Sequence, residues 1–168
     1  MNSEQKSLAL ELVQREALYL DEQRWDDWTA LYAPDCVFWV PMWKTDTQTT
    51  TDPETELSFI YLDGIRYLEE RVRRVVSGRA VSSVPVPRTA HLVGPGLASS
   101  DDGGRTVVVQ SAWRSQVYLH KDHEIVEYAG RYTHVLALDS DAGAYRIQQK
   151  KIVLNCDHLQ SKLDFYYL

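Results

Sequence analysis

Cysteine and long apolar runs are both scarce in this sequence. Only Cys36 and Cys156 occur among 168 residues, too few for a four-thiolate zinc site or iron–sulfur cluster. A disulfide between them is conceivable, but the simpler interpretation is two reduced, buried thiols. No run approaches the roughly 18 apolar residues of a membrane span, and the N-terminus lacks the apolar segment of a signal peptide. We therefore expect a cytoplasmic protein with no membrane partner.

Positive charge is also in short supply. Lysine and arginine total 18 against 24 acidic residues, which gives a formal net charge of −6 and argues against nucleic acid as a partner. The sequence contains no P-loop, Gly-x-Gly-x-x-Gly or Gly-x-Ser-x-Gly motif, so it indicates no nucleotide site or nucleophile elbow. Five scattered histidines predict no metal site. The cluster at 120–124 has ligand-type side chains, but we expect it at an exposed turn.

The first half of the sequence has mainly helical periodicity. Apolar residues at Leu8, Leu12 and Tyr19 predict a first helix, and Trp25 to Tyr32 fits a second, short one. Residues 36–40 are typical of a short strand, whereas 57–62 fits either a strand or a helix start. The polar segment 44–53 is either a solvated loop or an ordered loop at a subunit contact. A further amphipathic helix follows Gly64 and ends near Ser77.

The second half has a period of two. It predicts a strand near 91–97 interrupted by Gly94-Pro95-Gly96, and three long strands near 105–119, 124–138 and 144–156. Such lengths exceed the usual strand, so the strands must curl around the helices or extend into a partner. We expect one α+β domain spanning 1–168, with N-terminal helices packed on a long curved antiparallel sheet.

Aromatic residues are mostly those with a polar tip, since 5 Trp and 10 Tyr accompany only 3 Phe. Such side chains gather at interfaces and pocket rims. A curled sheet leaves a cavity at its open end, and Tyr32, Asp35, Trp39 and His91 are candidates to line it as acid–base groups. The simpler interpretation is that the aromatic pair belongs to the core and that His91 satisfies a buried carbonyl.

Several motifs in a fixed order resemble one family. They are Leu20-Asp21-x-x-x-Trp25-Asp26-x-Trp28-x-x-Leu31-Tyr32, Phe38-Trp39-Val40-Pro41-Met42-Trp43, Thr51-Asp52-Pro53-Glu54-x-Glu56, Leu68-Glu69-Glu70-Arg71-Val72, Arg88-Thr89-x-His91, Tyr128-x-Gly130-x-Tyr132, Lys150-Lys151-Ile152-Val153-Leu154-Asn155 and Leu163-Asp164-Phe165-Tyr166-Tyr167-Leu168. Together they resemble the small (β) subunit of aromatic-ring-hydroxylating dioxygenases, most closely the benzoate/anthranilate branch.

The resemblance implies a cone-shaped, cystatin-like or ketosteroid-isomerase-like fold and a structural role in aromatic catabolism. It implies a β trimer within an α3β3 complex. The α subunit would carry the Rieske [2Fe–2S] cluster and a mononuclear iron, with electrons from NADH. This chain would then hold no cofactor, metal or catalytic residue. We predict its subunit contacts at Trp39, Trp43, Phe165, Tyr166 and Tyr167, because they are aromatic residues in the motifs.

Two other classes of protein stay open on the sequence. A stand-alone dehydratase, isomerase or cyclase of the same cone fold requires the candidate cavity to be enclosed, with its side chains converging on one point. A binding module of the nuclear-transport-factor type requires no chemistry and predicts a homodimer through the sheet face.

Overall fold

The computed structural model describes residues 1–78, 84–140, 142–159 and 163–168. Three α-helices, seven strands and a 3-10 helix lie within these ranges. They are α1 (Ser3–Asp21), α2 (Trp25–Ala30), β1 (Tyr32–Pro41), β2 (Ser58–Asp63), α3 (Ile65–Val76), β3 (Arg88–Val93), β4 (Leu97–Ser99), β5 (Thr106–Leu119), β6 (Glu124–Asp139), β7 (Ala144–Leu154) and η2 (Phe165–Tyr167).

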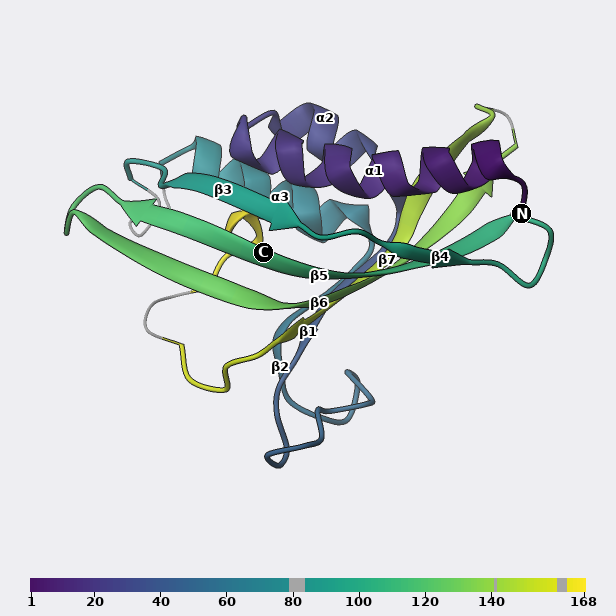
Figure 1. Ribbon diagram of the computed structural model, residues 1–168. Helices are drawn as coiled ribbons and strands as arrows, with labels where there is room; N and C mark the ends of the chain where they lie inside the picture. The colour runs from purple at the N-terminus through teal and green to yellow at the C-terminus, as the bar shows by residue number, and fades with distance from the viewer. Residues whose placement is uncertain (79–83, 141, 160–162) are drawn as a thin grey trace.

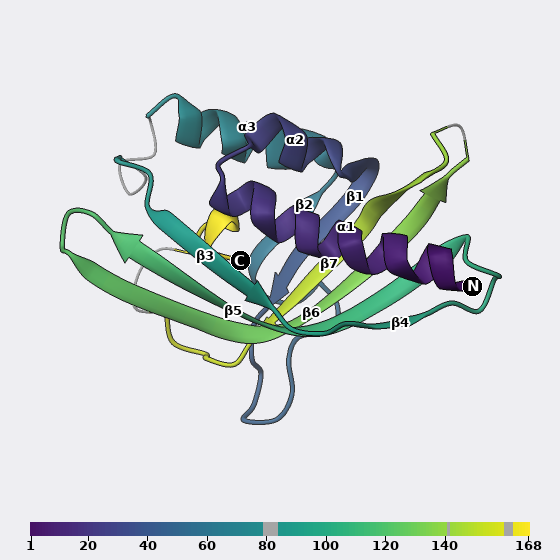
Figure 2. The same ribbon diagram turned by 45° about the horizontal axis from the view of Figure 1, so that its top comes forward.

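The strands form a single curved sheet in the order β2-β1-β7-β6-β5-β3, with β4 also pairing to β5. All three helices lie on the same, concave side of this sheet (Figure 1). The view in Figure 2 shows α1 running across the strands inside the curve. Inward side chains of the strands meet the helices there, so the hydrophobic core lies between the two layers.

The α+β prediction is confirmed, but the purely antiparallel arrangement is wrong. β1 pairs with β7 in parallel, while the other pairs are antiparallel. A period of two marks a strand, yet it does not show which distant strand becomes its neighbour or in which direction. β1 also begins at Tyr32, where we expected the end of a helix, and the ambiguous segment 57–62 forms β2.

Local sequence explains where α1 begins and which face it buries. The Asn2 side-chain oxygen accepts a hydrogen bond from the backbone N–H of Gln5, and the Gln5 side-chain oxygen accepts one from the Asn2 N–H, each at 2.8 Å. This capping box satisfies two donors that the helix itself leaves free. The buried face consists of Ala9, Leu12, Val13, Glu16, Ala17 and Leu20, so one carboxylate lies among apolar side chains. No helix of the described residues is long and apolar enough to cross a membrane.

Gly130 allows β6 and β7 to approach each other where the sheet bends. A Cβ at this position would lie 2.0 Å from the backbone oxygen of Val153. The residue paired with Gly130 on the neighbouring strand β5 is Trp113. The Trp113 ring stacks on the Tyr132 ring with centroids 4.7 Å apart. Glycine at this position therefore serves both the close strand approach and the aromatic stack above it.

We predict that Gly130→Ala lowers the free energy of unfolding by about 1–3 kcal/mol, because the methyl group forces the backbones of two central strands apart. Urea unfolding monitored by circular dichroism measures the change. Ala129→Ser, a substitution of similar size at the neighbouring outward position, should change stability by less than about 0.5 kcal/mol. Equal effects from the two variants would contradict this account of Gly130.

Candidate functional site

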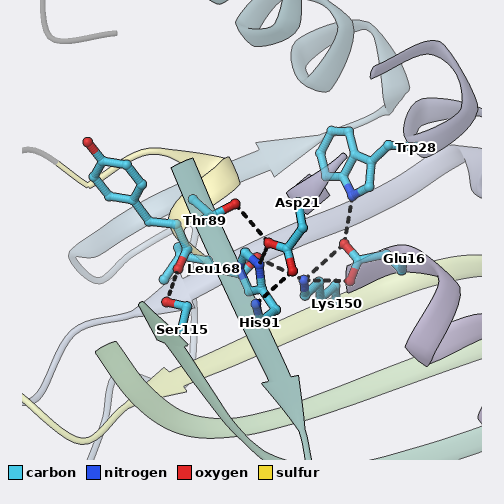
Figure 3. Close-up of polar contacts among 9 residues, drawn as sticks. Glu16, Asp21, Trp28, Thr89, His91, Ser115, Lys150 and Leu168 are labelled. Atoms are coloured by element: carbon cyan, nitrogen blue, oxygen red, sulfur yellow. Dashed lines mark hydrogen bonds and ion pairs between the residues drawn. The ribbon is translucent and has the colours of Figure 1, made fainter. Parts of the chain in front are cut away.

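The interior of the cone contains a buried ion pair between α1 and β7. The Lys150 ammonium lies 2.9 and 2.8 Å from the two carboxylate oxygens of Glu16, and both residues are fully buried. Trp28 and Tyr32 each donate a further hydrogen bond to Oε1, at 2.7 and 2.8 Å. Figure 3 shows the Lys150 and Trp28 contacts. The carboxylate is thus surrounded by donors, as a buried charge requires.

The segment Phe165–Leu168 packs against this cluster and contacts Trp28 of α2. Its four residues are at most 3% exposed. Phe165 stacks on Trp28 with centroids 4.9 Å apart, and Tyr167 lies nearly parallel to Tyr128 at 5.9 Å. Lys150 donates to the backbone oxygen of Leu168 at 3.1 Å. The segment is therefore fixed both by ring packing and by the buried ammonium.

A second polar pair lies beside the first, between the end of α1 and β3. His91 Nδ1 is 2.6 Å from Asp21 Oδ1, the same oxygen accepts from Thr89 Oγ1 at 2.8 Å, and the His91 N–H donates to Oδ2 at 2.8 Å (Figure 3). Burial raises the pKa of Asp21, but the bonds and charge of His91 outweigh it, so this pKa lies below its usual value. The Asp21 carboxylate accordingly ties the end of α1 to the edge strand.

Burial and neighbouring charges together set the pKa values of the inner groups. Burial opposes the charge on Glu16, yet the charge and hydrogen bonds of Lys150 keep its pKa below the usual value. Burial lowers the pKa of Lys150, opposed by Glu16. Burial and the neighbouring ammonium lower the pKa of His134 to about 3. His134 is therefore neutral at pH 7, and its Nε2, 4.0 Å from Glu16, forms no ion pair there.

The four residues predicted to line a pocket do not bond to one another in the described contacts. The Tyr32 hydroxyl belongs to the Glu16 cluster, and His91 belongs to the Asp21 pair. Asp35 is exposed and accepts from Gln148 at 3.1 Å. Trp39 lies against Lys151, whose ammonium is 4.3 Å from its ring, and donates to Ser58 at 2.9 Å. Phe165–Leu168 is buried between the helices and the sheet, where Phe165 stacks on Trp28 and the Tyr167 backbone oxygen accepts from Ser115.

The aromatic residues predicted at subunit contacts have different surroundings. Phe165, Tyr166 and Tyr167 are buried inside their own chain. The Trp43 indole donates to the backbone oxygen of Leu154 at 2.8 Å and is partly buried, while Trp39 is 5% exposed. Their place at an interface stays a prediction. In the single chain, the three C-terminal rings are already used for internal packing.

Sequence analysis missed Glu16, Asp21 and Lys150, although two of them left a signal. Glu16 falls on the apolar stripe of α1, four residues after Leu12 and four before Leu20. Lys150 is in phase with the inward residues Ile152 and Leu154 of β7. A charged residue at a core position is rarely left unpaired. The two charges could have been matched on that ground.

The part of the chain that the structure describes contains no set of side chains suited to bind a metal ion. No group of three or more His, Cys, Asp or Glu side chains there could hold a metal ion. The expected turn at 120–123 is present between β5 and β6, and His123 bonds to the Tyr118 hydroxyl at 2.9 Å. The described interior supplies fixed charges and packing rather than a metal site.

The architecture and its filled interior define a class of protein, the cone-shaped α+β domains. An NTF2-like protein with a cystatin-like fold from Novosphingobium aromaticivorans superposes with a TM-score of 0.64 at 12% identity, over 95% of this chain and 86% of that one. At such low identity the likeness concerns the fold alone.

Sequence comparison narrows the class to a family. The model of the ring hydroxylating beta subunit matches residues 15–161, and the chain belongs to this family. It is 33% identical to the benzoate 1,2-dioxygenase subunit beta of Acinetobacter baylyi over 91% of this chain and 88% of the relative. The structure of the beta subunit of the benzoate 1,2-dioxygenase from Burkholderia mallei superposes with a TM-score of 0.74 at 30% identity, covering 94% and 93%.

We predict that Glu16→Gln lowers the free energy of unfolding by about 3–5 kcal/mol, because it leaves the Lys150 ammonium buried without a counter-charge. The double variant Glu16→Gln/Lys150→Met should recover more than half of this loss, since it removes both charges and keeps an acceptor for Trp28 and Tyr32. Urea unfolding measures both values. A Glu16→Gln protein as stable as the wild type would show that the pair is not a constraint.

We predict that stability falls as the pH decreases from 6.5 towards 5, at up to about 1.4 kcal/mol per pH unit. The unfolded chain binds a proton at His134 near pH 6.5, whereas the folded chain does so only near pH 3, so protonation favours unfolding. His134→Leu should flatten this slope, measured as unfolding free energy at several pH values. An unchanged slope in the variant would assign the effect to other groups.

Proposed function

We propose that this chain is the structural β subunit of an aromatic-ring-hydroxylating dioxygenase acting on a benzoate-like aromatic acid. In this proposal, it forms a trimer within an α3β3 complex, and the α subunit holds the Rieske cluster and the mononuclear iron. Two findings support the reaction class. The chain belongs to the family, and its relatives include subunits of benzoate, toluate and anthranilate 1,2-dioxygenases. Dioxygen addition to the ring would then take place on the α subunit.

One observation carries the non-catalytic role. The space inside the cone, where related folds could admit a small molecule, is occupied by the chain's own Phe165–Leu168, held by Lys150 and Ser115. A catalytic group must touch its substrate, and the buried carboxylates here already bond to protein donors. Among the described residues there is no group of three or more potential metal ligands, and the proposal places the chemistry on the α subunit.

The alternative of a stand-alone dehydratase, isomerase or cyclase rests on the Asp21–His91 pair. Its geometry suits a general base, because Asp21 fixes Nδ1 and His91 Nε2 has no hydrogen-bond partner among the described residues. That nitrogen is buried, however, and the His91 side chain is 1% exposed. With no access for substrate in this conformation, we favour a role for the pair in attaching α1 to β3.

Co-expression with a Rieske-type α chain tests the proposal. We expect a tagged β chain to co-purify with α and to form a complex whose mass fits three copies of each. Oxygen uptake dependent on benzoate, anthranilate or salicylate should require both chains and the reductase, and the β chain alone should show none. A β chain that stays monomeric and binds no α chain would contradict the proposal.

A further inference from the structure

The outer face of the sheet contains an open groove that no helix covers. It has a volume of about 540 Å³ and lies over β5, β6 and β7. Gln110, Ala112, Arg131, Thr133, Lys151 and Val153 line it, and along each strand they alternate with buried residues. Because the helices all pack on the opposite side (Figure 1), the single chain leaves this face to solvent or to a partner.

The groove is cationic on a chain that is acidic overall. Arg131 and Lys151 contribute its charges, and none of its lining residues is a carboxylate. Among the described residues, neither cation has an ion-pair partner within 4.0 Å. Leu97 at one border is 77% exposed. The groove thus combines unneutralised positive charge with exposed apolar surface, which suits an acidic segment carrying an apolar side chain.

Such a segment lies on the same chain, in the loop between β1 and β2. This loop, residues 44–57, projects from the sheet away from the helices (Figure 2). Glu54 in this loop is exposed and has no side-chain partner in the described contacts, and Leu57 is 75% exposed. The loop therefore presents a carboxylate and an apolar side chain close together.

The loop is also ordered by its own contacts. Glu56 pairs with Lys44 and accepts hydrogen bonds from the backbone N–H groups of Thr51 and Asp52. Thr50 N–H donates to the Met42 oxygen at 2.8 Å. A loop fixed in this way loses little conformational freedom when it binds. Glu56 is engaged in these contacts, whereas the side chains of Glu54 and Asp46 have no partner among the described contacts.

We infer that the groove of one copy receives the loop 44–57 of a second copy of this chain, with Glu54 facing Arg131 and Lys151 and with Leu57 facing Leu97 and Val153. Complementary surfaces on one chain give a head-to-tail contact, and such contacts close into a ring when repeated around an axis. This inference rests on the proposed trimer and specifies which surfaces form it. The sequence predicted a subunit contact for the polar segment 44–53 of this loop, but not for the groove.

A charge exchange tests the contact. We expect Arg131→Glu and Glu54→Arg each to weaken self-association at least about tenfold, because each places like charges opposite one another. The double variant Arg131→Glu/Glu54→Arg should regain the wild-type oligomer, since it restores the opposite charges in reverse. Sedimentation velocity over a concentration series measures this, with the complete complex with the α chain tested in parallel.

Controls separate this inference from the trimer itself. Lys6→Glu makes the same charge change on an exposed position of α1, on the other side of the sheet, and should leave association unchanged. Unaltered circular dichroism of the single variants excludes unfolding, as expected for exposed positions. A wild-type chain that forms no trimer, alone or with α, overturns the proposed assembly. A wild-type trimer that both single variants preserve overturns only the loop-and-groove contact.

Discussion

The buried pair of Glu16 and Lys150 is the interaction on which the interior of this protein depends. Taking two charges out of water is costly, and the cost is offset only when every acceptor and donor finds a partner. Here the partners come from α1, α2, β1, β7 and the C-terminal segment. One carboxylate and one ammonium therefore fix the relative positions of elements that are far apart in the sequence.

The same requirement explains why the cone is closed. Lys150 needs an acceptor beyond Glu16, and the backbone oxygen of Leu168 supplies it. That contact, with the packing of Phe165 on Trp28, brings aromatic side chains into the space that a substrate would need. The Glu16 carboxylate and the Lys150 ammonium are consequently used to hold the fold together. This arrangement supports the proposed structural role of the chain.

The two faces of the sheet have different tasks. The concave face carries large apolar and aromatic side chains that meet the helices, whereas the outer face carries smaller and charged ones. An antiparallel sheet tolerates water on one side, so folding alone does not require the outer face to be covered. The cations there, which have no ion-pair partner among the described residues, and the projecting acidic loop are features that the core does not explain, and the proposed association between copies would give them a role.

Much of the fold follows from the order of residues. The long strands, the turn at 101–104 and the connection within 119–124 lie where period two and turn composition placed them, because backbone geometry converts these patterns directly into strands and turns. The motif order likewise indicates the family. The parallel pairing of β1 with β7 did not follow, because it joins segments more than 100 residues apart.

The residues of the site can likewise be separated into features that the sequence indicates and contacts that only the structure shows. The sequence by itself placed Glu16 and Lys150 in phase with apolar neighbours, and so determined that each would face the core. Only the tertiary structure decided that the two meet, that Tyr32 joins them while Asp35 turns to solvent, and that Phe165–Leu168 fills the cone. The physical reason is that periodicity records which way a side chain points, whereas its partner depends on how the whole sheet curves around the helices.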